Sequence, residues 1–289
     1  MLDQAQLDQF HRDGFLRLRQ VVGGDELELL RLAADRVQAD GLAGRGEHHY
    51  RPGGGTPLYW RSDRVWERDP IFAATTAHPH LLQAVGQCLG HGFLPVADAF
   101  ICAQRFGGQP ESWRQEVPYA DPQRRCTLGI PHFSACLFLD QATAENGCWW
   151  ALPGRHLAGH LALEEEDAEA LFAQARPLEL AAGDVLLLAA PAPRASRGNT
   201  SARSWRAFEI HYLAAQVLAS TFAHPPFPER GFNTQGLRLA AEFAALRRTL
   251  GLVFPADPQV PLGEEGFVPA GPPTTPPYHW RNLAGQASR

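Results

Sequence analysis

The chain contains no lysine, so arginine supplies all 26 of its basic residues. This bias is consistent with GC-rich coding and carries little functional weight. The five cysteines form no CxxC pair, and several lie inside apolar runs, as Cys136 does in residues 133–139. An odd, unpatterned set of cysteines is typical of buried, reduced thiols in a cytosolic protein.

Other features that are absent narrow the class of protein further. The first residues lack a basic region followed by an apolar run, so we expect no signal peptide. No segment approaches the roughly 18 consecutive apolar residues of a membrane span. The net charge of −5 argues against a broad nucleic-acid surface. We therefore expect a cytoplasmic protein whose partner is a small molecule and neither a nucleic acid nor a membrane.

The composition is that of a globular protein with a sizeable core, since 45% of the residues are hydrophobic and 20% are charged. The 289 residues are compatible with two domains or one large one. The element pattern favours a single domain in three parts. These are helices and a lid loop over 1–92, a jelly-roll core over 93–222 and a Pro-rich extension over 223–289.

Local patterns predict helices at both ends of the chain and strands between them. Helical spacing predicts helices over 3–12, 26–39, 79–89 and near 235–250, and residues 15–18 alternate as a strand. From residue 93 onward, the sequence pattern predicts β-strands, which are separated by turns rich in Gly, Pro and Asn. The expected fold class is mainly β with flanking helices, around a double-stranded β-helix (jelly roll, cupin-like) core. Its expected strands are 95–105, 128–139, 147–152, 178–180, 185–190 and 205–214.

Residues 40–70 fit neither the helical nor the strand pattern, because glycines alternate irregularly with aromatic residues that include Tyr59 and Trp60. A Gly-rich segment that carries aromatics is typical of a mobile loop that closes over a ligand. A surface loop without function fits the same pattern.

Three motifs follow one another over about 200 residues. The first is Trp-Arg-Gln-Glu-Val-Pro-Tyr over 113–119, and the second is Glu-Asn-Gly-Cys-Trp-Trp-Ala-Leu-Pro-Gly-Arg-His over 145–156. The third begins with Ala-Gly-Asp-Val at 182–185 and continues through Arg194, Ser196, Asn199 and Arg206 to His211.

These motifs resemble the phytanoyl-CoA dioxygenase family of iron- and 2-oxoglutarate-dependent oxygenases. The family patterns are close to W-H-Q-D-x-P-Y, then N-G-x-L-x-x-x-P-G-S-H, then A-G-D-V followed by H-G-S, N and R-R-A. The resemblance implies the jelly-roll fold and iron held by two histidines and a carboxylate. It does not cover residues 223–289.

Carried over residue by residue, the resemblance places the first iron histidine at Arg114, the carboxylate at Glu116 and the distal histidine at Arg194. A guanidinium stays protonated and has no lone pair for a metal. The arginine that pairs with 2-oxoglutarate falls on Trp205, with Arg206 beside it. We therefore expect that iron and 2-oxoglutarate binding are lost and that the protein uses no metal or cofactor.

Other histidines offer weak alternatives for a metal. His11-Arg12-Asp13 has the His-x-Asp spacing but precedes the barrel strands. Glu209-Ile210-His211 has suitable residue types on one face of a late strand, but the sequence identifies no third ligand. We expect His132, His156 and His160 to be structural.

The altered residues form a coherent set for organic chemistry. Without a metal, a buried Glu116 needs a counter-charge, which Arg114 or Arg194 can supply. Glu116 is then the expected general base or acid, and the two arginines are expected to stabilise negative charge on an anionic or carbonyl-containing substrate. Expected substrate contacts are Trp113, Tyr119, Trp150, Trp205, Arg206, Tyr59 and Trp60.

Three functions remain open from the sequence. The first is a redox-neutral biosynthetic enzyme (isomerase, dehydratase or cyclase) that acts on a natural-product intermediate without a metal. The second is a non-catalytic homologue, with a plugged iron site, that binds a small molecule or pairs with an active oxygenase. The third is an oxygenase with unusual ligands. The sequence does not distinguish a homodimer from such a heteromer.

Overall fold

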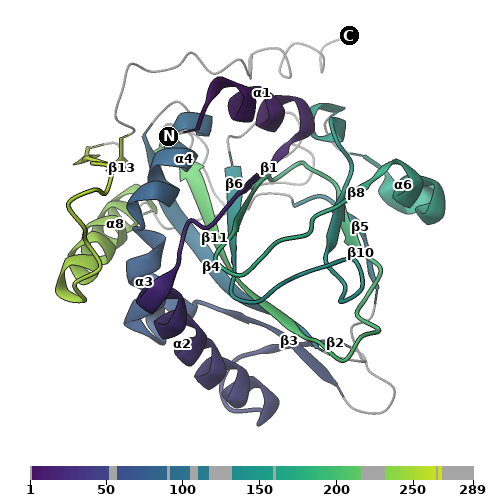
Figure 1. The fold of residues 1–289 in the computed structure, drawn as a ribbon, viewed down its shortest axis with the longest axis horizontal. Helices are drawn as coiled ribbons and strands as arrows, with labels where there is room; N and C mark the ends of the chain where they lie inside the picture. Colours follow the sequence, from purple (N-terminus) through teal and green to yellow (C-terminus); the bar gives the residue numbers. More distant parts are fainter. Residues whose placement is uncertain are drawn as a thin grey trace.

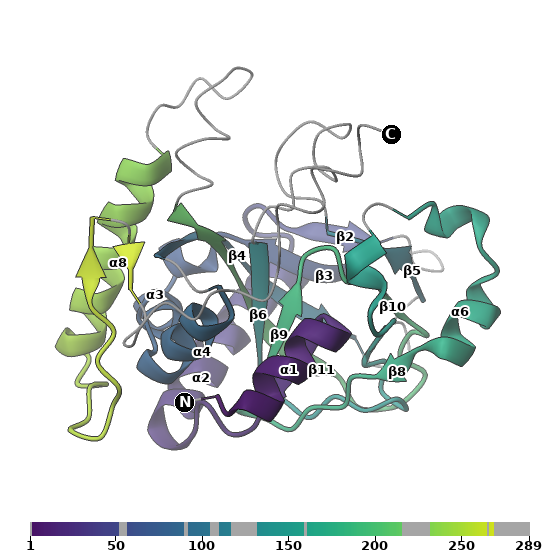
Figure 2. The ribbon, with the colours of Figure 1, turned by 90° about the horizontal axis from the view of Figure 1, so that it is seen from above.

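In the computed structural model, two antiparallel sheets face each other and enclose the interior of a barrel (Figure 1). The structure describes residues 2–51, 57–89, 92–104, 110–116, 132–158, 161–215, 232–264 and 266–268. Helices cover the outer face of the larger sheet, and the smaller sheet lies on the opposite side of the barrel (Figure 2).

The larger sheet has the strand order β1-β9-β6-β11-β4-β13-β12, with β3 also paired to β4 and β2 to β3. Long strands in its middle give it a rigid frame on which interior side chains can be placed. Its strands are β1 (Phe15–Leu18), β2 (His49–Arg51), β3 (Leu58–Asp63), β4 (Phe93–Ala103), β6 (His132–Phe138), β9 (Val185–Ala189), β11 (Trp205–Ala214), β12 (Leu262–Gly263) and β13 (Gly266–Phe267).

The smaller sheet has the order β5-β10-β7-β8. It consists of β5 (Glu111–Arg114), β7 (Trp149–Ala151), β8 (Arg176–Pro177) and β10 (Arg194–Ser196). In its register, the Cα of Arg194 lies opposite that of Arg114 on one side and that of Ala151 on the other. The two positions that the sequence singled out as altered ligand sites are therefore direct neighbours.

The helices begin and end at recognisable signals. A capping box at Asp3 opens the first helix, and Gly14 closes it in the left-handed conformation with a φ of 83°. The α-helices are α1 (Gln4–Asp13), α2 (Gly24–Leu42), α3 (Pro70–Thr76), α4 (Pro79–Leu89), α6 (Ala168–Gln174) and α8 (Phe232–Thr249). Short 3₁₀ turns are η1 (Val65–Glu67), η2 (Arg155–Ala158) and η3 (Leu163–Glu165).

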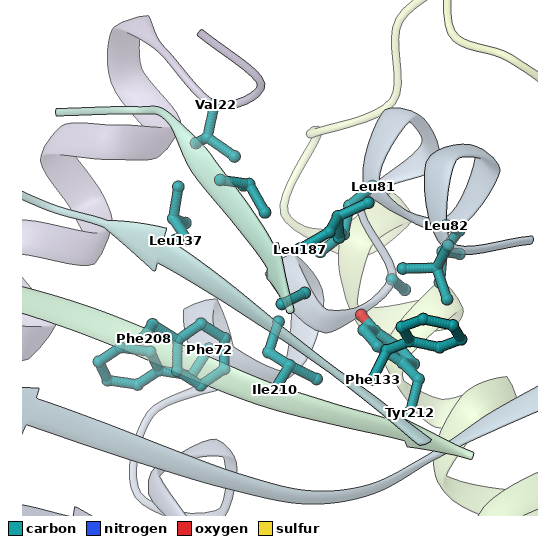
Figure 3. Packing of buried hydrophobic residues seen from close by; sticks show 14 of the residues in the cluster. Val22, Phe72, Leu81, Leu82, Phe133, Leu137, Leu187, Phe208, Ile210 and Tyr212 are labelled. Atoms are coloured by element: carbon teal, nitrogen blue, oxygen red, sulfur yellow. The ribbon is translucent and has the colours of Figure 1, made fainter. Parts of the chain in front are cut away.

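Strand β11 separates two cores because its side chains alternate between the faces of the sheet. Phe208, Ile210 and Tyr212 pack under the helices, together with Phe72 of α3 and Leu81 of α4 (Figure 3). Trp205 and Ala207 belong to a second core inside the barrel, where Phe138, Trp149 and Leu188 also lie. The alternation therefore directs Glu209 and His211 into the barrel.

The expected fold class is confirmed, and strand β11 has the predicted bounds of 205–214. The helices over 3–12, 26–39, 79–89 and 235–250 appear as α1, α2, α4 and α8, with ends shifted by a few residues. The strands predicted over 95–105, 128–139, 147–152 and 185–190 correspond to β4, β6, β7 and β9; residues 105 and 128–131 lie outside the described part.

Two local predictions are wrong. Much of the expected loop over 40–70 is the hairpin of β2 and β3, which adds to the edge of β4. The hairpin forms because residues 61–63 of β3 pair with β4 and because Tyr59 is buried against Gly41 of α2. The strand predicted over 178–180 is reduced to a single bridge between Leu180 and Ala142.

Four of the five cysteines lie in the described part, and all four are buried and free (Cys88, Cys102, Cys136 and Cys148), as the sequence predicted. No helix in the described ranges combines the length and the apolar character needed to cross a bilayer.

Candidate functional site

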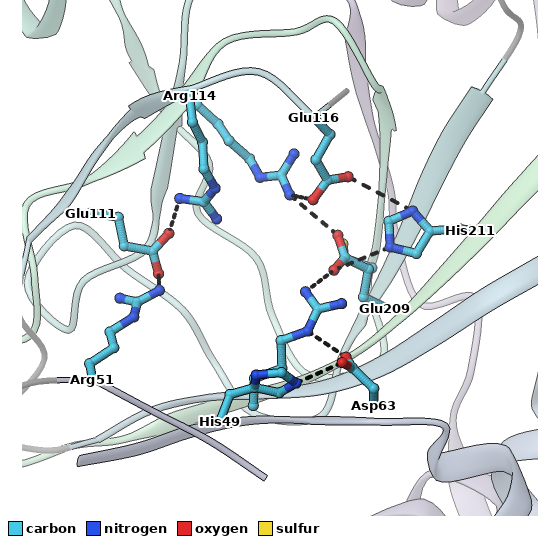
Figure 4. A network of polar contacts seen from close by, with 11 residues as sticks. His49, Arg51, Asp63, Glu111, Arg114, Glu116, Glu209 and His211 are labelled. Atoms are coloured by element: carbon cyan, nitrogen blue, oxygen red, sulfur yellow. Dashed lines mark hydrogen bonds and ion pairs between the residues drawn. The ribbon is translucent and has the colours of Figure 1, made fainter. Parts of the chain in front are cut away.

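A cluster of charged side chains fills the interior of the barrel between the two sheets (Figure 4). Glu209 and His211 come from β11, Arg61 from β3 and Arg194 from β10. Glu116 follows the end of β5, where its N–H donates to the carbonyl of Ala190 at 3.0 Å. Strands from both sheets therefore contribute to the cluster.

Arg194 is the central cation of this cluster. It is 1% exposed, its Nη2 donates to Glu116 Oε1, and the same nitrogen lies 3.5 Å from Glu209 Oε1. Its guanidinium carbon lies 5.2 Å from the ring centroid of Trp149, which closes off water on that side. Burial lowers the pKa of Arg194, but the two carboxylates outweigh burial and the pKa is raised.

Glu209 is completely buried and has three cationic neighbours. Besides Arg194, these are Arg61, with Nη1 at 3.6 Å from Oε2, and His211, with Nε2 at 3.6 Å from the same oxygen. Cys136 Sγ also donates to Oε1 at 3.5 Å. Burial raises the pKa of Glu209, but His211, Arg194 and Arg61 outweigh it, so the pKa is lowered and the carboxylate is ionised.

His211 lies between two carboxylates. Its Nδ1 is 3.8 Å from Glu116 Oε2, and its Nε2 faces Glu209. Burial lowers the pKa of His211, but the charge and hydrogen bonding of Glu209 outweigh burial, and the pKa is raised. The imidazole therefore carries a proton more readily than a free histidine.

A second group of charges surrounds Glu111 of β5. Glu111 accepts from Arg114 Nη1 and, through its other oxygen, from Arg51 Nη2 at 2.7 Å. Burial raises the pKa of Glu111, but the two arginines outweigh it and the pKa is lowered. The side chain of Arg114 is 35% exposed, so its charge is available to a ligand.

A pocket adjoins this second group. Its lining includes Arg51, Trp60, Glu111, Ser196, Asn199 and Trp205. The guanidinium of Arg51 lies 4.0 Å from the centroid of the Trp60 ring, a cation–π contact that holds the hairpin side of the pocket.

The structure brings together only part of the predicted site. Glu116 and Arg194 form an ion pair, whereas the observed partner of Arg114 is Glu111. Of the predicted substrate contacts, Trp60 and Trp205 line the pocket, as does Tyr59, whose ring packs toward α2. Tyr119 lies outside the described residues.

Three other predicted contacts face away from the barrel interior. Arg206 binds Asp140 and Asp35 on the helical side of the larger sheet, because it alternates with Trp205 along β11. Trp113 and Trp150 pack against Phe172 of α6 on the outer side of the smaller sheet. These three positions are corrections to the predicted set.

Sequence reasoning missed Glu209, His211 and Arg61 as members of the site. The signal for the first two was present, since Glu209-Ile210-His211 places both side chains on one strand face. The sequence did not show that Glu116 approaches that face from the other sheet. Arg61 lay inside the segment predicted as a loop.

The residues at the family's ligand positions do not fit iron. Two of the three are arginines, and the guanidinium of Arg194 already contacts the carboxylate of Glu116. Within the described ranges, one other set could hold a metal ion: Glu116, Glu209 and His211, whose ligand atoms lie within 4.8 Å of one another.

Comparisons with known proteins agree with this architecture. A family model described as Phytanoyl-CoA dioxygenase (PhyH) matches residues 10–208. A curated relative from Bos taurus, Phytanoyl-CoA dioxygenase domain-containing protein 1, is 26% identical over 296 residues, covering 80% of this chain and 97% of its own.

Solved structures share the fold at lower identity. AviO1 from Streptomyces viridochromogenes Tue57 has a TM-score of 0.61 and 21% identity over 79% of this chain and 99% of its own. SnoN is described as a non-heme alpha ketoglutarate dependent epimerase from nogalamycin biosynthesis. It has a TM-score of 0.61 and 16% identity, covering 73% of this chain and 80% of its own. The chain spans 49% of EvdMO1, with 72% of this chain covered, 21% identity and a TM-score of 0.59.

Proposed function

Because the chain belongs to the phytanoyl-CoA dioxygenase family but has arginine at both positions where its motifs place an iron-binding histidine, we propose a metal-independent, redox-neutral enzyme on an oxygenase fold. The proposed reaction is an isomerisation, dehydration or cyclisation of an anionic or carbonyl-containing intermediate. It uses acid–base groups and no cofactor.

The ion pair of Arg194 with Glu116 and Glu209 is the observation that carries this proposal. A guanidinium between two carboxylates supplies the counter-charge that a buried acidic site needs. The site therefore keeps ionised carboxylates in a water-poor interior without a metal. Such carboxylates are suited to moving protons.

Glu116 is the proposed base because its side chain is 22% exposed, while Glu209 is fully enclosed. It removes a proton from a carbon next to a carbonyl group, and the electron pair of that C–H bond becomes an enolate. Arg114, two residues earlier, stabilises the negative charge on the enolate oxygen. Glu116 or the imidazolium of His211 then returns a proton to a different carbon or to the opposite face. No electrons leave the substrate.

The biological setting is part of the proposal. SnoN provides a precedent for an epimerase from a biosynthetic pathway on this fold, and we propose a natural-product intermediate as substrate. The buried free thiols support a reducing, cytoplasmic environment. A heteromer with an active oxygenase remains the competing function, in which the cluster would only replace a lost iron site.

Deuterium exchange tests the proposal without knowledge of the natural substrate. The full-length protein, treated with a chelator and kept free of oxygen, is incubated in D₂O with a panel of 2-oxo acids and simple ketones, whose uncatalysed exchange is slow. We expect deuterium at the carbon next to the carbonyl in at least one compound, measured by mass spectrometry. Glu116→Gln should reduce this exchange by at least about 100-fold, the lower range for a positioned acid–base group.

The folded Glu116→Gln protein is the control, and its circular dichroism spectrum should match that of the wild type. No exchange above background with any member of the panel, or equal exchange by Glu116→Gln, would contradict the proposed chemistry. Stoichiometric iron together with consumption of 2-oxoglutarate and oxygen would instead establish an oxygenase with unusual ligands.

A further inference from the structure

We propose that the guanidinium of Arg194 occupies the place of a divalent cation, and that Glu116, Glu209 and His211 form a metal site that this guanidinium blocks. The inference concerns binding and not turnover, so it does not depend on the proposed reaction. The metal class that suits one imidazole and two carboxylates is Mn²⁺, Fe²⁺ or Zn²⁺.

The three side chains already have the spacing of a metal-binding set. Their ligand atoms lie within 4.8 Å of one another and come from two sheets that face each other. The ligand atoms of a tetrahedral zinc ion, with bonds of about 2.1 Å, are about 3.4 Å apart. Small rotations of the side chains would therefore bring all three atoms into coordination distance.

The guanidinium matches this site imperfectly. Nε and Nη1 of Arg194 are buried and have no hydrogen-bond partner among the described residues. Within the same part of the chain, Oε2 of the fully buried Glu209 also accepts no hydrogen bond. The donors of the planar guanidinium are thus only partly used, and the donors that face Glu209 Oε2, on Arg61 and His211, are each 3.6 Å away. A point charge with ligands on several sides would suit the same oxygens better.

Arg194 nevertheless excludes a metal from the native protein. Its Nη2 contacts one oxygen of Glu116 and approaches one oxygen of Glu209, so it lies between the carboxylates where an ion would bind. A divalent ion would have to displace this cation, and Arg61 adds further positive charge at 3.6 Å from Glu209. In the native chain, the donor atoms of a metal site therefore surround the guanidinium of Arg194 in place of a metal ion.

Replacement of Arg194 by methionine tests the inference, since methionine keeps much of the buried volume and removes the charge. Isothermal titration of the chelator-treated, full-length protein with Mn²⁺ and with Zn²⁺ measures the affinity. We expect Arg194→Met to bind one ion at least about 100-fold more tightly than the wild type. The double variant Arg194→Met/Glu209→Gln should lose this gain.

Arg206→Met is the matched control. It also removes an arginine that bridges two carboxylates, those of Asp140 and Asp35, but no histidine faces that pair in the described structure. We expect no comparable gain in affinity there. An equal gain in Arg206→Met would show that loss of any such arginine suffices, and it would overturn the inference.

The inference also fails if folded Arg194→Met binds no more tightly than the wild type, if Glu209→Gln leaves the gain intact, or if the wild type binds one ion as tightly as the variant. Should Arg194→Met not fold in metal-free buffer, refolding is measured with and without Mn²⁺ for it and for Arg194→His. Recovery of the fold by the metal supports the inference, and no recovery in either variant overturns it. Deuterium exchange by the wild type separates these outcomes from failure of the proposed reaction.

Discussion

At the scale of single residues, the site is defined by how the charge of Glu209 is compensated. This carboxylate is fully buried, and its neighbours are the guanidinium groups of Arg194 and Arg61 and the imidazole of His211, whose pKa is raised. Removing one of them would leave the carboxylate less compensated in a medium of low dielectric constant. His211 is the one whose charge can change near neutral pH.

The raised pKa of His211 leads to a prediction about pH. A histidine whose pKa is higher in the folded than in the unfolded state adds stability below its unfolded pKa of about 6.5. This contribution is lost as the pH rises through the folded pKa. We therefore expect the difference in unfolding free energy between the wild type and His211→Gln to favour the wild type more at pH 6 than at pH 9.

Urea unfolding of both proteins at the two pH values measures this difference. The absolute cost of the substitution is not decisive, because glutamine also changes the packing. An advantage of the wild type that grows between pH 6 and pH 9 would contradict the assigned direction of the shift.

At the scale of elements, a buried ion pair joins the first part of the chain to its C-terminal helix. Glu26 of α2 receives two hydrogen bonds from Arg247 of α8, at 2.7 and 2.9 Å, and one from Thr75 of α3 at 3.0 Å. Both charged side chains are nearly inaccessible to solvent. The pair therefore fixes the helical layer behind the larger sheet, which carries three of the five residues of the charged cluster.

Arg247→Met should destabilise the protein by about 3–5 kcal/mol, because it leaves Glu26 buried without its counter-charge. The double variant Glu26→Gln/Arg247→Met should recover much of this loss, since neither charge remains. Urea unfolding gives the free energies. Arg238→Met is a matched control on the same helix, where the partner Glu242 is exposed, and it should change stability by less than about 0.5 kcal/mol. Equal losses in Arg247→Met and Arg238→Met would contradict this role for the buried pair.

The strands that could be predicted from the sequence are those whose side chains alternate regularly between the two faces of a sheet. Strand β11 alternates buried side chains between the barrel and the helical side from Trp205 to Tyr212, and the sequence pattern predicted its bounds. Strands β2 and β3 were missed because glycines and aromatics interrupt the pattern. Their pairing depends on contact with β4, which lies more than 30 residues later in the sequence.

At the scale of the whole molecule, the site required contacts that no local pattern contains. The motifs around residues 114 and 194 predicted that both arginines are close to Glu116, and the register of β5 with β10 makes the two arginines neighbours. That Arg194 binds Glu116 while Arg114 binds Glu111 is decided by side-chain packing. That Glu116 faces His211 is decided by how the two sheets close into a barrel.

Three buried groups outside the charged cluster contribute to the dependence of overall stability on pH. Burial lowers the pKa of His78 to about 3 and that of His156 to about 4. Both imidazoles are neutral in the folded protein but protonate on unfolding below pH 6.5, so each reduces stability as the pH falls. Asp98 acts in the opposite direction, because burial raises its pKa to about 7 and the folded state keeps its proton where the unfolded state does not.

Between about pH 6 and pH 4.5, the unfolded chain therefore binds one more proton than the folded chain at these three groups. These three groups together should therefore lower stability by about 1.4 kcal/mol for each unit by which the pH falls. Asp98→Asn removes the opposing group, so the loss should steepen toward about 2.7 kcal/mol per unit. His78→Gln should flatten it, since one proton fewer is taken up on unfolding. Urea unfolding at four pH values in this range gives the slopes, and a slope that Asp98→Asn leaves unchanged would show that the buried carboxyl is ionised in the folded protein.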